Sequence, residues 1–213
     1  GNDIYLFAAY IKHAIKYFRA TAAQENNLPP KEQFAKNLHS FIALIEQSFT
    51  QFNIKPNEYC RNILMNAWAQ EGNYVACEEL MKTYNSKYNL QPDIVAYNEI
   101  ITANLNTLQP ERHQVAMHIV THTLPLLGLK PSHVTVSSFA RYYVQRKDLP
   151  ALRDFIHNKH YNFMQYCNVR CVTFLIGSLI KFGDTKSALD FFLSASNLKT
   201  DEQTTDDNNN NNN

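Results

Sequence analysis

The stretch Pro92-Asp93-Ile94-Val95-Ala96-Tyr97-Asn98 has a counterpart earlier in the chain, Pro56-Asn57-Glu58-Tyr59-Cys60-Arg61-Asn62. Two weaker counterparts begin at Pro131 and Cys167. The spacing is 36 residues from 56 to 92, 39 from 92 to 131 and 36 from 131 to 167. A fixed period in this range is typical of stacked supersecondary units, none of which buries its apolar face alone. We therefore expect any function to lie on a surface built from several units.

Each unit is predicted to be a pair of helices, because the chain has only 5 glycines in 213 residues and its apolar residues recur at helical spacing. In the second unit the first helix is expected over residues 58–70. Gly72 suits the reversal that follows, since glycine adopts positive φ without cost. Gly183 holds the same place in the last unit. The sequence thus predicts an all-α fold of helix-turn-helix repeats.

The predicted organisation has a degenerate or capping hairpin, four repeats and a tail. The tail is acidic and rich in asparagine, and this composition predicts disorder. In order, the segments are 1–55 (hairpin), 56–91, 92–130, 131–166 and 167–199 (repeats), and 200–213 (tail).

Two local features refine the repeats. The repeat that starts at Pro92 has three extra residues, which we expect near residues 109–111, between its two helices. In the repeat that follows, Asp148-Leu149-Pro150 predicts the cap and first turn of the second helix.

The charge balance gives no strong indication of a partner. The formal net charge is +1, but the tail has four acidic residues and no Lys or Arg, and without these four the net charge is +5. The folded part is therefore mildly basic, less so than many nucleic-acid-binding domains. No run of 18 apolar residues is present, so no membrane span is expected. The first twenty residues have a basic and apolar composition compatible with an organelle transit peptide, but their aromatic density favours a buried repeat helix.

Candidate metal and catalytic sites are weak. His118 and His122 are four residues apart, as metal ligands often are, but no acidic or Cys residue completes a set, and a helix surface explains them. Cys167 and Cys171 have the same spacing, and Cys171 occupies a small-residue packing position of the repeat. The sequence contains no phosphate-binding glycine loop, nucleophile elbow or paired carboxylates. We expect no cofactor, no metal and no enzymatic activity.

The repeat resembles the pentatricopeptide repeat family. Its pattern is Pro-Asp, then Tyr-Asn, then a pair of aliphatic residues such as Ile100-Ile101. The tetratricopeptide pattern has a different period and different conserved types. The resemblance spans residues 56–199, is strongest at Pro92 and weakest at Pro131, and leaves another kind of α-solenoid as the alternative. It implies a right-handed α-solenoid of about four to five hairpins that binds single-stranded RNA, one base per repeat.

In this family two side chains contact the edge of each base, and a third packs against its faces. Transferred to this chain, the resemblance implies that Asn62 and Asp93 favour uridine, Asn98 and Ser132 cytidine, and Ser137 and Asn168 adenosine. Thr173 needs a partner near Asp201 or Glu202, and Thr with Asp favours guanosine. The base-stacking positions would be Tyr59, Val95, Val134 and Arg170.

Asparagine inside a helix supports this interpretation, because its side chain competes for backbone hydrogen bonds and lowers helix propensity. Asn62 and Asn98 occupy the same position in two first helices, and an amide matches a pyrimidine edge. The alternative is a set of asparagine hydrogen bonds between neighbouring helices. A second alternative concerns the helix starts, because four residues there are good N-cap types whether or not RNA binds: Asn57, Asp93, Ser132 and Asn168.

Two classes of function remain open. The first is RNA binding in the processing, stability or translation of organelle transcripts, with the mitochondrial matrix as the expected location and RNA-processing or ribosomal proteins as further partners. The second is a protein-interaction solenoid. The chain could also be the accessory repeat domain of a larger RNA polymerase or RNA-processing enzyme.

Overall fold

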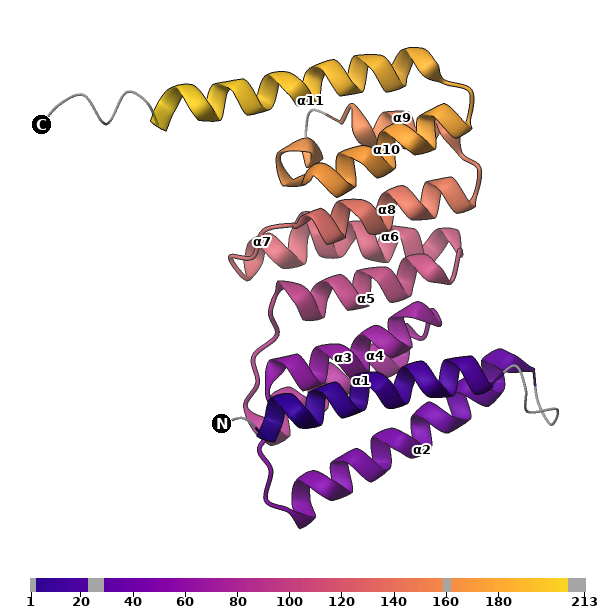
Figure 1. Ribbon diagram of the computed structural model, residues 1–213, viewed down its shortest axis with the longest axis vertical. Coiled ribbons are helices and arrows are strands. Elements are labelled where there is room, and N and C mark those ends of the chain that lie inside the picture. The colour runs from indigo at the N-terminus through magenta and orange to yellow at the C-terminus, as the bar shows by residue number, and fades with distance from the viewer. Residues whose placement is uncertain (1–2, 23–28, 159–161, 207–213) are drawn as a thin grey trace, which may run out of the picture. The chain divides into compact units, whose positions relative to one another are not determined.

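A computed structural model describes residues 3–22, 29–158 and 162–206, and all regular structure in these ranges is helical (Figure 1). The predicted all-α fold of helical hairpins is confirmed. The chain divides into two compact units, Gly1–Leu129 and Lys130–Asn213. We call them the N-terminal and the C-terminal unit.

The N-terminal unit contains the first hairpin and two repeats. Its last helix continues without a break through a π-helical turn. The elements are α1 (Asp3–Thr21), α2 (Pro30–Gln51), α3 (Glu58–Gln70), α4 (Tyr74–Tyr88), α5 (Ile94–Asn106), α6 (Pro110–His118), the π turn η1 (Ile119–Thr123) and α7 (Leu124–Leu126).

The C-terminal unit contains the other two repeats, with elements α8 (His133–Gln145), α9 (Leu149–Ile156), the 3-10 turn η2 (Phe163–Tyr166), α10 (Val169–Lys181) and α11 (Thr185–Asp206). Helix α11 continues past residue 199 to Asp206, within the segment expected to be a disordered tail, and the disorder of that tail stays a prediction. No Gly or Pro follows residue 199 to end the helix. Residues 207–213 lie outside the described residues.

The first helix of every repeat starts at a side-chain cap. Asn57 accepts a hydrogen bond from the Cys60 backbone N–H at 3.0 Å, and Asp93 accepts one from the Ala96 N–H at 2.8 Å. Ser132 and Asn168 cap α8 and α10 in the same way. Such caps satisfy N–H groups that have no partner within the helix. The expectation that these four residues are N-caps is therefore confirmed.

The hairpin turns follow the sequence closely. Gly72, between α3 and α4, has a φ of 75°, and Gly183, between α10 and α11, has a φ of 79°. At Gly72 a Cβ would also lie 3.3 Å from the backbone of Asn106 in the next repeat. Asp148 caps α9 by accepting from the Ala151 N–H, as predicted.

The three extra residues of the repeat at Pro92 are not where the sequence analysis placed them. The loop between α5 and α6, residues 107–109, is as short as the loop between α3 and α4, residues 71–73. The extra residues lie instead in the second helix, which contains the π turn Ile119–Thr123, and in the loop after it. A π turn accommodates additional residues inside a helix without ending it.

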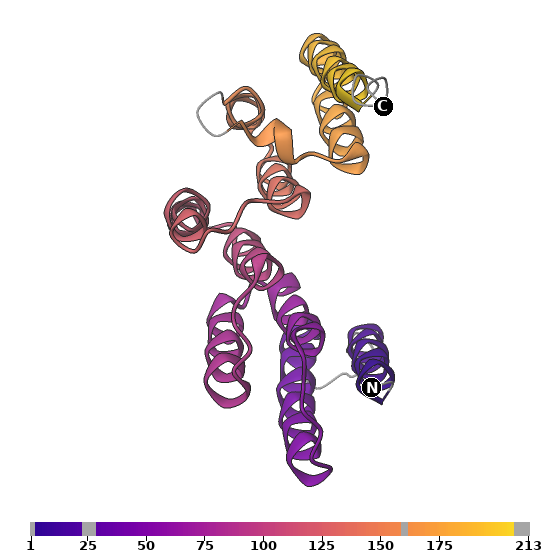
Figure 2. The same ribbon diagram turned by 90° about the vertical axis from the view of Figure 1, so that its left-hand side faces the viewer.

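In the N-terminal unit, α3 packs between helices on different sides. Figure 2 shows α1 and α4 on opposite sides of α3. Helix α3 also packs along α5, and the core between these helices is apolar, with Leu64, Trp68 and Ile101 buried. The face of α3 that does not pack on α4 is therefore turned toward α1.

Candidate functional site

A groove in the N-terminal unit lies between α1 and the first helices α3 and α5. Its volume is about 910 Å³. Three of the residues predicted to contact RNA line it, namely Tyr59, Asn62 and Val95. We call it the N-terminal groove. Its other lining residues are Ala9, Lys12, His13, Ile15, Lys16, Arg19, Ile63, Asn66, Ala67 and Glu99.

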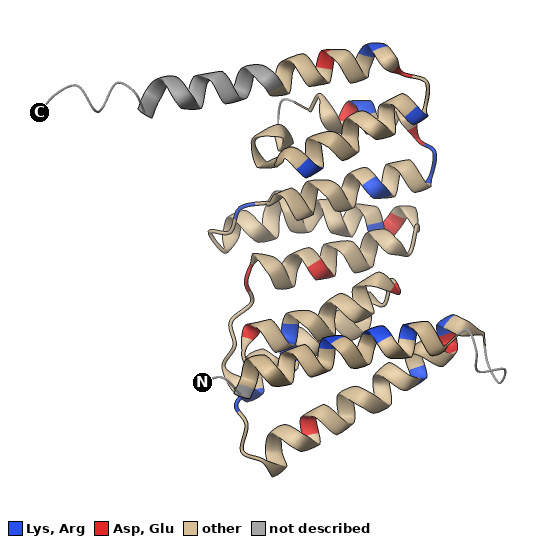
Figure 3. Cartoon of the chain, in the orientation of Figure 1, with Lys and Arg blue, Asp and Glu red and all other residues tan. Residues whose placement is uncertain are grey.

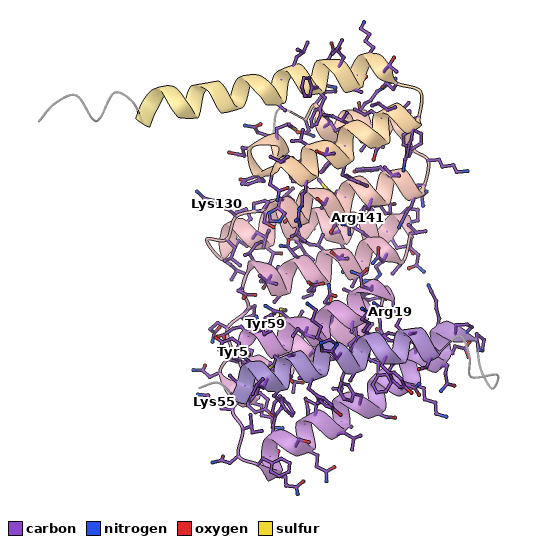
Figure 4. The ribbon with its side chains drawn as sticks, in the orientation of Figure 1. Tyr5, Arg19, Lys55, Tyr59, Lys130 and Arg141 are labelled. Carbon is purple, nitrogen blue, oxygen red and sulfur yellow. The ribbon has the colours of Figure 1, made fainter. Side chains whose placement is uncertain are left out.

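The stacking positions in this groove expose apolar surface. Tyr59 is 48% exposed and Val95 is 44% exposed, although both belong to helices whose other faces are buried. Figure 4 shows Tyr59 near the start of α3. Exposed aromatic and branched side chains on a groove wall are the kind of surface on which bases stack.

The predicted pair Asn62 and Asp93 is held by Arg61. The Arg61 Nε donates to the Asn62 Oδ1 at 3.0 Å, and one terminal nitrogen donates to the Asp93 Oδ1 at 2.9 Å. The Asn62 Nδ2 also lies 3.5 Å from the Asp93 Oδ2, the limit of a hydrogen bond. The structure therefore brings the two residues together, with both side chains already engaged inside the protein.

Arg61 is the residue that the sequence analysis overlooked. Its side chain is fully buried and also donates to the backbone carbonyls of Leu90 (3.3 Å) and Gln91 (2.9 Å). It therefore connects the first helix of one repeat to the start of the next. Arg61 stands where the neighbouring repeat has Tyr97. In the sequence, this departure from the repeat pattern was the one indication that residue 61 has a special role.

The second predicted pair is less accessible. Asn98, on α5, is buried, with 3% of its surface exposed. Its predicted partner Ser132 belongs to the C-terminal unit and caps α8. The assignment of this pair to cytidine stays a prediction.

A second groove lies within the C-terminal unit, between α8 and α10, with a volume of about 530 Å³. We call it the C-terminal groove. Four of its lining residues are predicted RNA contacts: Val134, Ser137, Asn168 and Arg170. The other lining residues are His133, Ser138, Arg141, Val169 and Phe174.

Thr173 is not among the residues that line this groove. It is exposed, and its hydroxyl donates to the Val169 carbonyl within α10 at 2.8 Å. The side chains of its suggested partners, Asp201 and Glu202, lie outside the described residues.

The cations of the two grooves come from different elements. In the C-terminal groove they belong to the first helices of the repeats, with Arg141 on α8 and Arg170 on α10. In the N-terminal groove Lys12, Lys16 and Arg19 all come from α1, and Figure 3 shows Lys and Arg positions recurring along this helix.

The N-terminal groove also contains one acidic residue, Glu99 on α5. Burial raises the pKa of its carboxyl group to about 7, while a hydrogen bond from the Asn66 Nδ2 at 3.0 Å opposes this shift. Because burial disfavours the charged form, Glu99 changes its charge near neutral pH. The charge that Glu99 contributes to this groove therefore depends on pH near neutrality.

The histidine and cysteine pairs form local contacts. The rings of His118 and His122 stack with centroids 4.5 Å apart. The sulfur atoms of Cys167 and Cys171 lie 3.3 Å apart, and the hydrogen bond from Cys167 lowers the pKa of the Cys171 thiol. Within the described residues, no group of three or more His, Cys, Asp or Glu side chains is placed to hold a metal ion. No helix among the described residues has the length and apolarity needed to cross a membrane.

Comparison with solved structures shows a similarity to the pentatricopeptide repeat protein PPR10 from maize, with a TM-score of 0.48 and 15% sequence identity. The match covers 89% of this chain and 24% of that protein, so the chain spans about a quarter of its length. No protein-family model and no curated protein matches the sequence.

Proposed function

We propose that this chain binds single-stranded RNA and selects it by base identity, with the N-terminal and C-terminal grooves as contact surfaces. One observation supports this most directly. In each unit, residues that the family resemblance assigns to base faces and to base edges line the same groove. They are Tyr59, Val95 and Asn62 in one, and Val134, Arg170, Ser137 and Asn168 in the other.

Each groove offers chemistry suited to a nucleobase. Tyr59 and the planar head of Arg170 can stack on a base of any identity. Asn62, Ser137 and Asn168 supply amide and hydroxyl groups that can donate to or accept from a base edge. Asn168 uses its side-chain oxygen to cap α10. Because the residue is exposed, its amide N–H groups can donate to a base.

The stacking free energy limits the RNA affinity that so short an array can reach alone. Stacking contributes roughly 1–3 kcal/mol per base, so about four bases provide on the order of 4–12 kcal/mol before the cost of ordering the strand. Tight binding therefore needs further repeats or a larger particle. We propose a non-catalytic role in organelle RNA processing, stability or translation, in the mitochondrial matrix.

The direct test is a binding assay with short RNAs, read by fluorescence anisotropy at low salt. We expect tighter binding to an oligomer that contains U-C-A than to one of the same composition in which these bases are reversed. A DNA oligomer of the same sequence is the control for sugar recognition. Equal affinity for both RNAs would contradict base selection, and no RNA binding at any salt concentration would overturn the proposal.

Substitution of a stacking residue tests the groove itself. Replacing Tyr59 with Ala should weaken RNA binding by roughly 1–3 kcal/mol. Tyr10→Ala is the matched control, because Tyr10 is an exposed tyrosine of the same unit that does not line the groove. An equal loss for both variants would contradict the assignment.

A protein-interaction scaffold is a second candidate function. It is favoured by the apolar side chains that α1 exposes outside the groove, which include Leu6 and Tyr17. Recovery of a stable protein partner whose binding is lost in a Leu6→Glu, Tyr17→Glu variant, with RNA binding unchanged, would support this function.

A further inference from the structure

Helix α1 presents a line of basic side chains to the N-terminal groove. Lys12, Lys16 and Arg19 are spaced four and three residues apart, so they lie on one side of the helix. All three line the groove together with Tyr59 and Asn62. A helix that only capped the first repeat would not need cations on the side that faces the predicted RNA contacts.

An ion pair fixes how α1 is aligned with α3. The Arg19 guanidinium lies 3.3 Å from the carboxylate of Glu71, the C-cap residue directly after α3. The two helices run in the same direction, as Figure 1 shows, and both rise by about 1.5 Å per residue. Counting back seven residues from this contact places Lys12 level with Leu64 of α3, two residues beyond Asn62.

The three cations are not equally available. Arg19 is engaged by Glu71 and lies over the Phe34 ring, with its guanidinium carbon 4.8 Å from the ring centroid. Lys12 and Lys16 are exposed, and neither takes part in the ion pairs found among the described residues. Two lysines therefore face the groove with no carboxylate of the described part of the chain paired to them.

The first helices of this unit supply no exposed cation of their own. The only Lys or Arg in α3 is the buried Arg61, and α5 has none and contributes Glu99 to the groove. In the C-terminal groove, by contrast, Arg141 and Arg170 belong to the helices that hold the predicted base contacts. In the N-terminal unit, α1 is thus the source of positive charge beside the base-contacting face.

We propose that Lys12 and Lys16 bind phosphate groups of the RNA segment whose bases meet Tyr59, Val95 and Asn62. This inference rests on the proposed function of RNA binding. It assigns α1, expected from the sequence to be a degenerate or capping helix, to the binding site itself. The bases face α3 and α5, and the sugar-phosphate backbone faces α1.

The test is the salt dependence of RNA binding by a Lys12→Gln, Lys16→Gln variant. Each phosphate contact to a single strand contributes roughly −0.7 to the slope of log K against log salt. The loss of two contacts should therefore make the slope of the variant less steep by about 1.4. The affinity ratio of the original chain to the variant should then be about sevenfold larger at about 50 mM than at about 200 mM salt.

The matched control is Lys36→Gln with Lys82→Gln, which removes the same charge from exposed positions of α2 and α4 that do not line the groove. Circular dichroism verifies that both variants keep their helices. If the original chain binds RNA and the two variants have the same slope, the phosphate contacts of α1 are refuted while RNA binding stands. If the original chain binds no RNA at all, the proposed function fails first.

A second measurement locates the contacts along the strand. Uncharged methylphosphonate linkages are placed singly along the RNA, and each loss of affinity is measured for the original chain and for the variant. We expect the linkages flanking the uridine assigned to Asn62 to matter for the original chain and not for the variant. Identical profiles for the two proteins would contradict the proposal.

Discussion

The guanidinium of Arg61 lies 2.9 Å from the carboxylate of Asp93 and joins two successive repeats. Arg61 is fully buried, whereas 40% of the Asp93 side chain is exposed. The same carboxylate caps α5 through the Ala96 N–H. One acidic side chain therefore starts a helix and pairs with a buried cation of the preceding repeat.

Replacing Arg61 with Leu is expected to destabilise the N-terminal unit by roughly 2–4 kcal/mol, because the carbonyls of Leu90 and Gln91 lose a buried donor. Urea unfolding followed by tryptophan fluorescence measures this unit directly, since Trp68 on α3 is the only tryptophan of the chain. Asp93→Asn keeps an oxygen for the helix cap and should cost less. A larger loss for Asp93→Asn than for Arg61→Leu would contradict this assignment of roles.

Replacing Asn62 with Thr is expected to change the preferred base from uridine to guanosine at one nucleotide, because the Asp93 partner is retained. Competition binding with RNAs that differ only at this nucleotide measures the change. Asn66→Thr, one turn further along the same helix, is the control and should leave base preference unchanged. An unaltered preference for uridine in the Asn62 variant would refute the assigned pair.

Asn98→Thr is expected to have a different outcome from Asn62→Thr. Asn98 is buried, so its replacement disturbs packing and hydrogen bonding as well as any contact with a base. We expect a loss of stability of roughly 1–2 kcal/mol in urea unfolding, together with any change in base choice. A change in base choice at full stability would show that the amide turns outward when RNA binds.

RNA affinity should rise as the pH is lowered through about 7, because Glu99 becomes neutral and no longer repels phosphates. The gain should be on the order of two- to tenfold in titrations between about pH 8 and about pH 6. The other titratable groups of the groove are Lys12, His13, Lys16, Arg19 and Tyr59, and from α4 the Cys77 thiol interacts with Glu99.

Two variants separate these contributions. Glu99→Gln should remove most of the pH dependence of RNA affinity, whereas His13→Gln should retain it.

The pH dependence of folding stability provides an independent check. Since the pKa of Glu99 is about 7 when folded and 4.5 as its ordinary value, the folded state binds more protons between these values. Stability should therefore fall as the pH rises through this window, and Glu99→Gln should abolish the decline.

Gly72→Ala should destabilise the N-terminal unit more than Gly128→Ala. Both glycines have positive φ, which costs an L-residue roughly 1–2 kcal/mol. At Gly72 an added Cβ would also lie 3.3 Å from backbone atoms of Asn106 and Thr107, whereas nothing lies within 4 Å at Gly128. Urea unfolding of the two variants should differ by about 1 kcal/mol or more. Equal losses would indicate that the two repeats separate readily at this turn.

Local chemistry made much of the fold predictable. Asn57 and Gly72 delimit the first helix and the turn of one repeat, and each acts through its own backbone or through groups within three residues. Such contacts depend on the neighbouring sequence, so helix α3 was predicted with its observed bounds. It was also predictable that Tyr59, Asn62 and Val95 share one face of the first helices. Tyr59 and Val95 hold the same place in successive repeats, and Asn62 lies about one helical turn after Tyr59.

Contacts between distant parts of the chain were not predictable in this way. Whether Arg61 is buried depends on carbonyl groups about thirty residues away, and a charged residue type alone predicts exposure. The burial of Asn98 and the placement of α1 beside α3 depend on how neighbouring helices pack. The extra residues of the repeat at Pro92 lie in a π turn because helix geometry can absorb them, which sequence alone did not indicate.

The bond from Arg61 to Asp93 crosses the boundary at which the repeat pattern would divide the chain. Engineering that shuffles repeats as interchangeable cassettes would cut at Pro92 and leave a buried guanidinium behind without its counter-ion. A transplantable module must instead extend through Asp93, or replace Arg61 with the tyrosine found at that position in the following repeat.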